Sequence, residues 1–373
     1  MSWWAAPAIG ATAYYLLALI AALRWRIWTQ GSLPHHEDAD PEFLPISILK
    51  PIRGRDPKFY EAIRSHAAQE YPEFEILFGM SDPDDPASED IARLQQEFPH
   101  VPISAYYVST KALNVKAGVL SALAKHARHP LLLVNDSDIV VEPGYLRAVA
   151  APLTDHTIGM VTCLYRADAE SPASRAEALG IATEFAPSVL VARLLGVAEF
   201  ALGSTMVFRA ETLRAAGGFE AIQDYLADDY QLGARIHALG LRIQFAPVVV
   251  ETDLGAESWA QTWRHQLRWS RTIRVSNRMG YYGYVITHAT LWSAVAFGAR
   301  EWTIGAIALG VRIVAGVVVG RSILRYRRTL VDAWVIPLRD LFGFVVWLGG
   351  LFGTHVVWRG KRLTLKSDGR LIG

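Results

Sequence analysis

The residues best suited to chemistry follow a short apolar run in the middle of the chain. Residues 131–134 (LLLV) lead directly into the sequence NDSD, which contains Asp136 and Asp138. A continuous apolar run of this length is typical of a strand buried on both faces of a parallel sheet. Mg²⁺ is commonly held by one or two carboxylates together with substrate phosphates. Asp136 and Asp138 are therefore predicted metal ligands, and the alternative is a pair of solvated aspartates in a β-turn.

Two further acidic positions are expected near the functional edge of the same sheet. Asp82 follows the apolar run 75–80, and Asp229 opens a predicted helix. In open α/β sheets, ligands bind beyond the carboxyl ends of the strands, where Asp82 would lie. A carboxylate held at a helix start is well placed to act as a general base. Asp228 or Asp229 can also serve simply as the helix N-cap.

Strands and helices alternate through the middle of the chain, which predicts βαβ units and a mostly parallel sheet. The predicted strands are 46–49, 75–80, 103–108, 131–134, 158–165, 204–208 and 241–245. The predicted helices are 58–69, 87–98, 114–127 with Lys116 near its start, 175–195 and 228–239. No GxGxxG or GxxxxGK[ST] follows any of these strands, which disfavours a Rossmann dinucleotide site or a P-loop. A nucleotide diphosphate would then depend on a metal ion for binding.

Apolar residues are concentrated toward both ends of the 373-residue chain, whose formal net charge is only +1. Trp3 to Leu23 contains no charged residue and is followed by Arg24 and Arg26. This pattern predicts a membrane span that leaves the following domain in the cytoplasm; a buried core helix is the alternative. A cleaved signal peptide is disfavoured. A single cysteine fits a reducing compartment, and the lack of a strongly basic domain argues against nucleic-acid binding.

The C-terminal part is predicted to associate with the membrane. Residues 257–274 form an amphipathic pattern of Trp and Arg, typical of an interfacial helix, a diphosphate clamp or a plain surface helix. Residues 281–299 and 302–320 are predicted spans, and Arg312 inside the second should face protein. Residues 331–358 are predicted to form a re-entrant or interfacial helix.

These predictions divide the chain into six parts. They are an anchor (1–28), a linker (29–45), a cytoplasmic catalytic domain (46–255), an interfacial helix (256–280), a membrane region (281–358) and a basic cytoplasmic tail (359–373). His35 and His36 lie in the linker, where a solvated patch is favoured over a metal site because nothing local holds their geometry.

Five motifs together carry a family resemblance over nearly the whole chain. They are ISILKPIRGRDP, EILFGMSDPDDPA (75–87), NDSDIVV (135–141), LADDYQLGARI (226–236) and RHQLRW (264–269). The set resembles the lipid glycosyltransferases of the GT-A fold, and most closely the ceramide glucosyltransferase family, glycosyltransferase family 21. Asp138 stands where ceramide enzymes often have glycine, which is more similar to the bacterial branch that glycosylates hopanoid lipids.

The resemblance implies an α/β GT-A enzyme in an integral membrane protein, with a bacterial inner membrane as the expected location. It implies inverting transfer of glucose or N-acetylglucosamine from a UDP-sugar to a membrane-lipid hydroxyl, on ceramide or a hopanoid. A divalent metal, Mg²⁺ or Mn²⁺, on Asp136 and Asp138 is the implied cofactor.

The resemblance also implies residue roles. Asp82 resembles the aspartate that contacts uracil, and Asp229 resembles the base. The residues expected to contact the nucleotide-sugar are Asp82, Lys116, Asp136, His265, Gln266, Arg268 and Trp269. His265 occupies the first position of the family's (Q/R)xxRW signature, where Gln or Arg is usual, so the contact made by that position differs here.

Three other interpretations compete with this one. A polyprenyl-phosphate glycosyltransferase would need no base, because its acceptor is already an anion. A processive polysaccharide synthase normally needs more spans than this chain offers. A membrane-bound sugar-nucleotide scaffold would bind the donor without catalysis, and the presence of Asp136, Asp138 and Asp229 argues against it.

Overall fold

The computed structural model describes residues 2–32, 43–358 and 361–372, and it divides into two compact units. The sheet unit comprises Ser32–Tyr165, Ala198–Asp253 and Arg370–Gly373. The helical unit comprises Met1–Gly31, Arg166–Val197 and Leu254–Gly369. The predicted linker histidines His35 and His36 lie outside the described residues.

The sheet unit is built on a seven-stranded sheet with the order β3-β2-β1-β4-β6-β5-β7. The strands β3, β2, β1 and β4 are parallel, and β6 runs antiparallel to both β4 and β5. The strands are β1 (Ile46–Ile52), β2 (Phe74–Met80), β3 (Ile103–Tyr107), β4 (Leu131–Val134), β5 (Ile158–Asp168), β6 (Met206–Arg209) and β7 (Arg242–Asp253). The predicted fold class, a GT-A-like α/β fold with a mostly parallel sheet, is confirmed.

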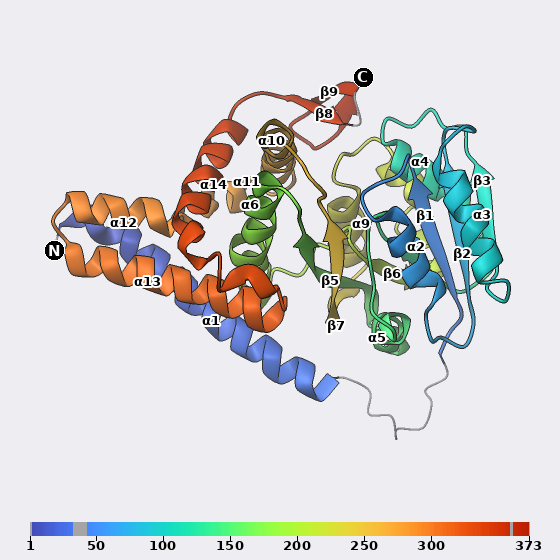
Figure 1. Ribbon diagram of the computed structural model, residues 1–373, viewed down its shortest axis with the longest axis horizontal. Helices are drawn as coiled ribbons and strands as arrows, with labels where there is room; N and C mark the ends of the chain where they lie inside the picture. The colour runs from blue at the N-terminus through green and yellow to red at the C-terminus, as the bar shows by residue number, and fades with distance from the viewer. Residues whose placement is uncertain (1, 33–42, 359–360, 373) are drawn as a thin grey trace. The chain divides into compact units, whose positions relative to one another are not determined.

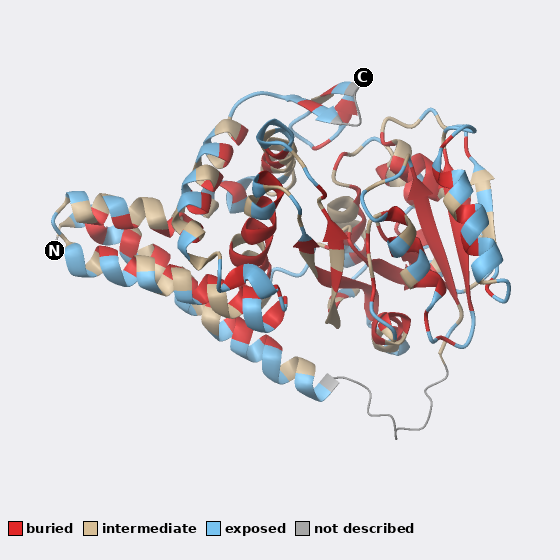
Figure 2. Cartoon of the chain, in the orientation of Figure 1, coloured by how far each residue is buried: buried red, intermediate tan, exposed pale blue. Residues whose placement is uncertain are grey.

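Both faces of this sheet are covered, which explains why its central strands are continuously apolar. Ile48 on β1 packs with one hydrophobic core, and its neighbour Leu49 packs with the core on the opposite face. Helices α2, α3 and α5 contribute to the first core, whereas α4, α8 and α9 contribute to the second. Figure 2 shows the central strands as buried throughout. The helices are α2 (Phe59–Ala67), α3 (Ala87–Glu97), α4 (Val115–Ala124), α5 (Tyr145–Ala150), α8 (Ala210–Ala215) and α9 (Asp228–Ala238).

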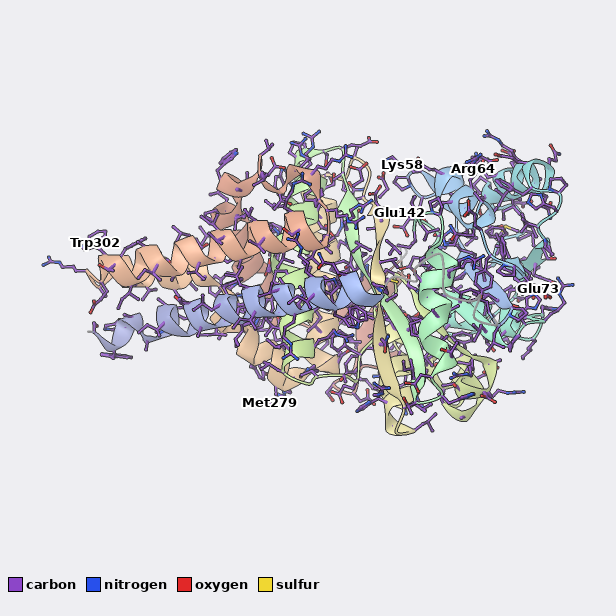
Figure 3. The ribbon with its side chains drawn as sticks, turned by 90° about the horizontal axis from the view of Figure 1, so that it is seen from below. Lys58, Arg64, Glu73, Glu142, Met279 and Trp302 are labelled. Atoms are coloured by element: carbon purple, nitrogen blue, oxygen red, sulfur yellow. The ribbon has the colours of Figure 1, made fainter. Side chains whose placement is uncertain are left out.

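The helical unit contains a long N-terminal helix packed against a helical hairpin (Figures 1 and 3). Ala8 of α1 (Ala6–Ser32) packs with Ala296 of α12 (Ala289–Gly298) and Ala308 of α13 (Trp302–Val318). One further cluster joins Tyr15 and Ala18 of α1 to Ala289 and Ala315. From the first cluster to the second, the contacting residues have higher numbers on α1 and α13 and lower numbers on α12. Helix α12 is therefore antiparallel to α1, α13 is parallel to it, and the hairpin ends on the side where α1 ends.

The membrane prediction needs one correction. Residues 281–299 do not form one span: α11 (Arg278–Gly283) and a 3₁₀ turn end before His288, and α12 has only 10 residues. At about 1.5 Å per residue, such a helix is too short to cross a bilayer core. Among the described residues, three helical stretches are long and apolar enough to cross, and they are Trp3–Gly31, Trp302–Ile323 and Ala333–Gly350. The last of these includes α14 (Ile336–Gly350), where the sequence predicted a re-entrant or interfacial helix.

The helical segment that corresponds to the predicted helix 175–195 is slightly longer than predicted. It belongs to the helical unit, although the chain before and after it belongs to the sheet unit. It is built from α6 (Pro172–Gly180), a π-helical turn and α7 (Ala186–Leu194), all within the helical unit. The chain therefore leaves the sheet unit after Tyr165 and returns at Ala198. The amphipathic helix forms as α10 (Trp259–Ser276). The segment 331–358 is not helical to its end, because β8 (His355–Trp358) is a strand that pairs with β9 (Lys361–Leu365) of the expected basic tail.

Candidate active site

The parallel strands bring the two predicted acidic turns to one edge of the sheet. Leu49 of β1 pairs with Val134 of β4, and Ile52 pairs with Met80 of β2, so all three strands end at this edge. The turn with Asp82 follows β2, and the turn with Asp136 and Asp138 follows β4. The topology thus brings together what the sequence separates by about 50 residues.

Asp136 lies at the centre of a charged cluster. Lys116 Nζ lies 2.7 Å from Asp136 Oδ1 and 3.4 Å from Asp228 Oδ2. Burial opposes the charge on Lys116, but Asp136 and then Asp228 outweigh it and raise the pKa of Lys116 above its usual value. Lys116 therefore stays a cation that connects β4, α4 and the start of α9. The structure brings together Asp136 and Asp228, which come from two of the motifs, and Lys116, which was expected to contact the nucleotide-sugar.

A second buried lysine supports the same turn and was missed from sequence. Lys50 is fully buried inside β1, and its Nζ donates to the backbone oxygen of Asp136 at 3.0 Å. Burial lowers the pKa of Lys50 to about 7, although Asp138 and Asp136 oppose that shift. A lysine inside an apolar strand must find a partner, because an unpaired buried charge is costly. The sequence ISILKP carries that signal, but the predicted strand ends at Leu49, whereas β1 continues through the lysine to Ile52.

Asp138 is the second predicted metal ligand in the turn after β4, and its surroundings indicate whether a cation fits there. The Thr252 hydroxyl donates a hydrogen bond to the Asp138 carboxylate, and this bond holds β7 against the turn. Burial, and then the charge of Asp136, raise the pKa of Asp138 to about 6. Two carboxylates that disfavour each other's charge, one of them partly exposed, suit a hard divalent cation with oxygen ligands. The donor set therefore fits the implied metal.

Helix α9 presents two carboxylates in its first turn. Asp228 is 7% exposed and faces Lys116, whereas Asp229 is less buried. Neither is the N-cap, because the cap residue is Ala227, so both interact with the positive end of the helix dipole instead. Asp229 Oδ2 accepts a hydrogen bond from Gly203 N at 2.9 Å. Burial and the charge of Asp228 raise the pKa of Asp229 to about 6.

Asn114 holds α4 and the segment before α9 together. Its Oδ1 accepts from Ala117 N at 3.0 Å and caps α4, which orients Lys116 in the first turn. Its Nδ2 donates to Tyr225 O at 2.8 Å, close in sequence to the two aspartates of α9. A single buried side chain thus determines the spacing of the lysine and the carboxylates.

Asp82 is exposed, and its described contact is local. Its Oδ1 accepts from Asp84 N at 3.0 Å, which closes a turn after β2. The neighbouring Asp85 accepts from Gly54 N at 2.7 Å and so joins the turn after β2 to the turn after β1. An exposed carboxylate at a strand end is available to a ligand, and its assignment to uracil remains a prediction.

The predicted signature residues lie on α10 in the helical unit. His265 Nδ1 is 2.8 Å from Glu177 Oε1, and the His265 and Trp269 rings lie 4.5 Å apart. Gln266 is buried and accepts from Arg339 Nη2 at 3.0 Å. Arg268 lies on the same helix. The packing of His265 and Gln266 is accounted for by residues of the helical unit.

A solved structure shares the fold of this chain. Mannosyltransferase PcManGT from Pyrobaculum calidifontis, solved in complex with GDP-Man and Mn²⁺, has a similar fold with a TM-score of 0.54. The two are 18% identical, and the likeness covers 94% of this chain and 99% of that one. The likeness shows that the chain has a GT-A-like fold.

The family follows from the sequence match. The profile of Glycosyl transferase family 21 matches residues 5–371, and the chain belongs to this family. Ceramide glucosyltransferase 1 of Caenorhabditis elegans is 27% identical over 213 residues, which is 56% of this chain and 46% of that protein. Ceramide glucosyltransferase of Candida albicans is 26% identical over 163 residues, 36% of this chain and 30% of that protein. The chain spans about half the length of the C. elegans relatives. The predicted family is confirmed, and the three apolar helices fit a membrane protein.

Proposed function

We propose that this protein is an inverting lipid glycosyltransferase that moves a hexose from a UDP-sugar to the hydroxyl of a membrane lipid. The observation that carries this proposal is the cluster of Asp136, Lys116 and Asp228 beside Asp229 at the carboxyl edge of the sheet, in a family 21 chain. Glucose or N-acetylglucosamine is the proposed sugar, and ceramide or a hopanoid is the proposed lipid. The ceramide glucosyltransferase relatives support a lipid acceptor.

Each residue of the cluster has a different proposed role in the reaction. Asp229, oriented by the hydrogen bond from Gly203, accepts the proton of the attacking acceptor hydroxyl. A divalent cation would be held by Asp136 and Asp138 and would supply charge stabilisation for the leaving diphosphate. Lys116 and Lys50 hold the turn that carries both carboxylates, so the ligands need little reorganisation before the reaction.

The membrane arrangement agrees with an acceptor that arrives from the bilayer. We propose that α1 anchors the protein with the sheet unit in the cytoplasm, since Arg24 and Arg26 follow the apolar run. The α12–α13 hairpin ends on the side where α1 ends, so Arg321 and Arg325 are proposed to lie on the same side.

The substrates are identified by one direct experiment. Membranes that contain the protein are incubated with UDP-glucose or UDP-N-acetylglucosamine and offered ceramide or a polyhydroxylated hopanoid, and products are identified by mass. A new glycolipid that depends on the protein supports the proposal. UDP binding without any sugar transfer would instead favour the scaffold interpretation.

Removing the predicted metal ligands should strongly reduce transfer. Asp136→Asn is expected to lower kcat by about 10²- to 10³-fold, because charge stabilisation of the leaving group is commonly worth that much. Chelation by EDTA should lower the wild-type rate similarly, and added Mg²⁺ or Mn²⁺ should restore it. Initial rates with radiolabelled UDP-sugar measure both effects. Glu211→Gln, an exposed change in α8, serves as the control and should be neutral; full activity of Asp136→Asn would contradict the metal assignment.

Transfer should decline as pH falls below about 6. The raised pKa of Asp229 means that it becomes protonated there, and a protonated carboxyl cannot accept the acceptor's proton. We expect kcat/KM to be constant at neutral pH and to fall about tenfold per pH unit below the pKa. Donor affinity measured over the same pH range separates this effect from titration at Asp138. A flat kcat/KM profile down to about pH 4.5 would exclude Asp229 as the base.

A further inference from the structure

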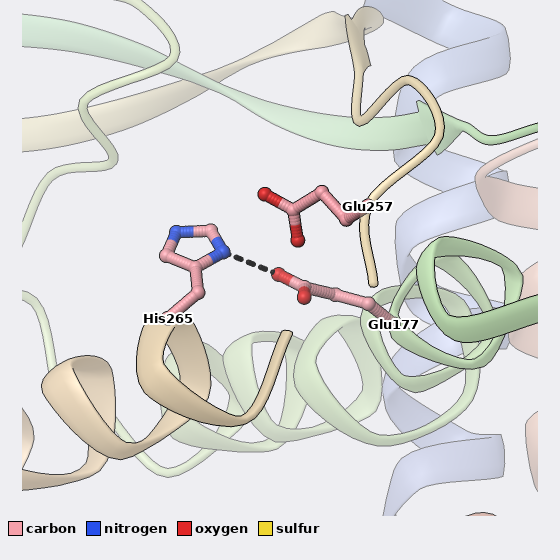
Figure 4. Close-up of side chains that lie close together, drawn as sticks. All are labelled: Glu177, Glu257 and His265. Atoms are coloured by element: carbon pink, nitrogen blue, oxygen red, sulfur yellow. Dashed lines mark ion pairs between the residues drawn. The ribbon is translucent and has the colours of Figure 1, made fainter. Parts of the chain in front are cut away.

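Three side chains with metal-ligand chemistry converge in the helical unit (Figure 4). They are Glu177 on α6, Glu257 just before α10, and His265 on α10. Each offers one ligand atom, and these atoms all lie within 4.8 Å of one another. None of the three is among the metal ligands discussed above.

Glu177 is a buried carboxylate whose side chain is 1% exposed and whose oxygens lack hydrogen-bond donors among the described residues. His265 Nδ1, 2.8 Å from Oε1, likewise makes no hydrogen bond of acceptable geometry there. A second carboxylate, Glu257, lies beside this buried one, so repulsion adds to the cost of desolvation. A cation among the three would compensate for both.

The surrounding hydrogen bonds hold the ligands before any ion binds. Ser171 Oγ donates to Glu257 O at 2.5 Å, and Ser174 Oγ donates to Gly255 O at 2.7 Å, which ties the start of α6 to the segment before α10. Ser258 caps α10 through a capping box, which determines where His265 lies along that helix. Thr262 donates to the Glu257 carboxylate at 3.3 Å. Such supporting contacts orient metal ligands in proteins.

We propose that Glu177, Glu257 and His265 form a site for a divalent transition-metal ion, with Zn²⁺ as the best match. Two carboxylates and one imidazole are a ligand set that suits Zn²⁺ or a neighbouring first-row ion, whereas Mg²⁺ prefers oxygen ligands alone. Water completes a tetrahedral shell. The ion joins α6 to α10 and sets the orientation of His265 against Trp269. This proposal rests on geometry and does not depend on the proposed transfer reaction.

The test measures metal binding directly in the full-length protein. The purified chain carries Asp136→Asn and Asp138→Asn, which removes the other predicted ligands, and is stripped of metal and dialysed against Zn²⁺. Elemental analysis should find one Zn²⁺ per chain. Glu177→Gln and His265→Gln should each weaken binding at least tenfold, the range seen when metal-site contacts are lost. Glu170→Gln, an exposed change in the same unit, should bind like its parent.

A second measurement distinguishes the loss of a metal ligand from misfolding of the variant. Co²⁺ replaces Zn²⁺, and its visible absorption bands should appear in the parent and disappear in His265→Gln, whose side chain is partly exposed and so tolerates replacement. Each variant's unfolding midpoint is recorded with and without Zn²⁺, since an ion that binds only the folded state raises it. Stoichiometric binding that survives both substitutions would overturn the proposal, as would a parent that binds no Zn²⁺ or Co²⁺.

Discussion

Asp229→Asn is expected to lower the rate of sugar transfer by about 10²- to 10⁴-fold while leaving donor affinity almost unchanged. Asparagine has the same shape and keeps an oxygen that can accept the hydrogen bond from Gly203 N. It cannot take up the proton of the acceptor hydroxyl, so only the chemical step is lost. Single-turnover rates with a UDP-sugar and a lipid acceptor, together with donor affinity by calorimetry, measure the two quantities separately.

The controls for this experiment come from the same region. Asp224→Asn changes an exposed carboxylate before α9 and should leave transfer unaffected. Asp228→Asn removes a partner of Lys116 and is expected to disturb donor binding, which Asp229→Asn should not. Normal transfer by Asp229→Asn would show that no base is needed and would favour a phosphate acceptor such as a polyprenyl phosphate.

Asp340→Ala is expected to cause the largest loss of stability, about 3–5 kcal/mol. The prediction that Arg312 faces protein is confirmed, because Arg312 is fully buried and makes a two-point contact with Asp340. Arg312 Nη2 lies 2.5 Å from Oδ1, and Nε lies 3.0 Å from Oδ2. Thr290 of α12 donates to the same carboxylate at 2.7 Å. Removing Asp340 takes away the carboxylate that is hydrogen-bonded to Arg312, in a span where water is scarce.

Thermal unfolding of a set of variants distinguishes a stability loss caused by an unpaired charge from one caused by lost packing. Thermal unfolding in detergent should show a clearly lower midpoint for Asp340→Ala. The double substitution Arg312→Leu with Asp340→Leu should recover most of the loss, because apolar replacement of a whole buried pair is often neutral. Asp332→Asn, which breaks the exposed pair with Arg328, should cost less than about 1 kcal/mol. A single Asp340→Ala variant as stable as the wild type would refute this account of the pair.

The strands and most helices of the sheet unit were predictable because their signals are local. Continuous apolar runs such as 131–134 indicate strands that are buried on both faces, and β4 forms there with the predicted bounds. The four acidic residues Asp82, Asp136, Asp138 and Asp229 followed from the same logic, since they lie where a strand ends or a helix begins. The break before α12 was not predicted, because Tyr281 to Ala299 contains no Asp, Glu, Lys or Arg, and hydropathy does not report where a helix stops.

By itself, the sequence determined the family, the α/β fold class and the positions of Asp82, Asp136, Asp138 and Asp229 at element ends. Only the tertiary structure decided which partners these residues have. Lys50, Lys116 and Thr252 come from β1, α4 and β7, and the order of the sheet brings them to one turn. Likewise, Glu177 meets His265 because α6 packs in the helical unit. Local patterns reflect backbone periodicity, whereas the pairing of buried charges depends on contacts between segments that are distant in sequence.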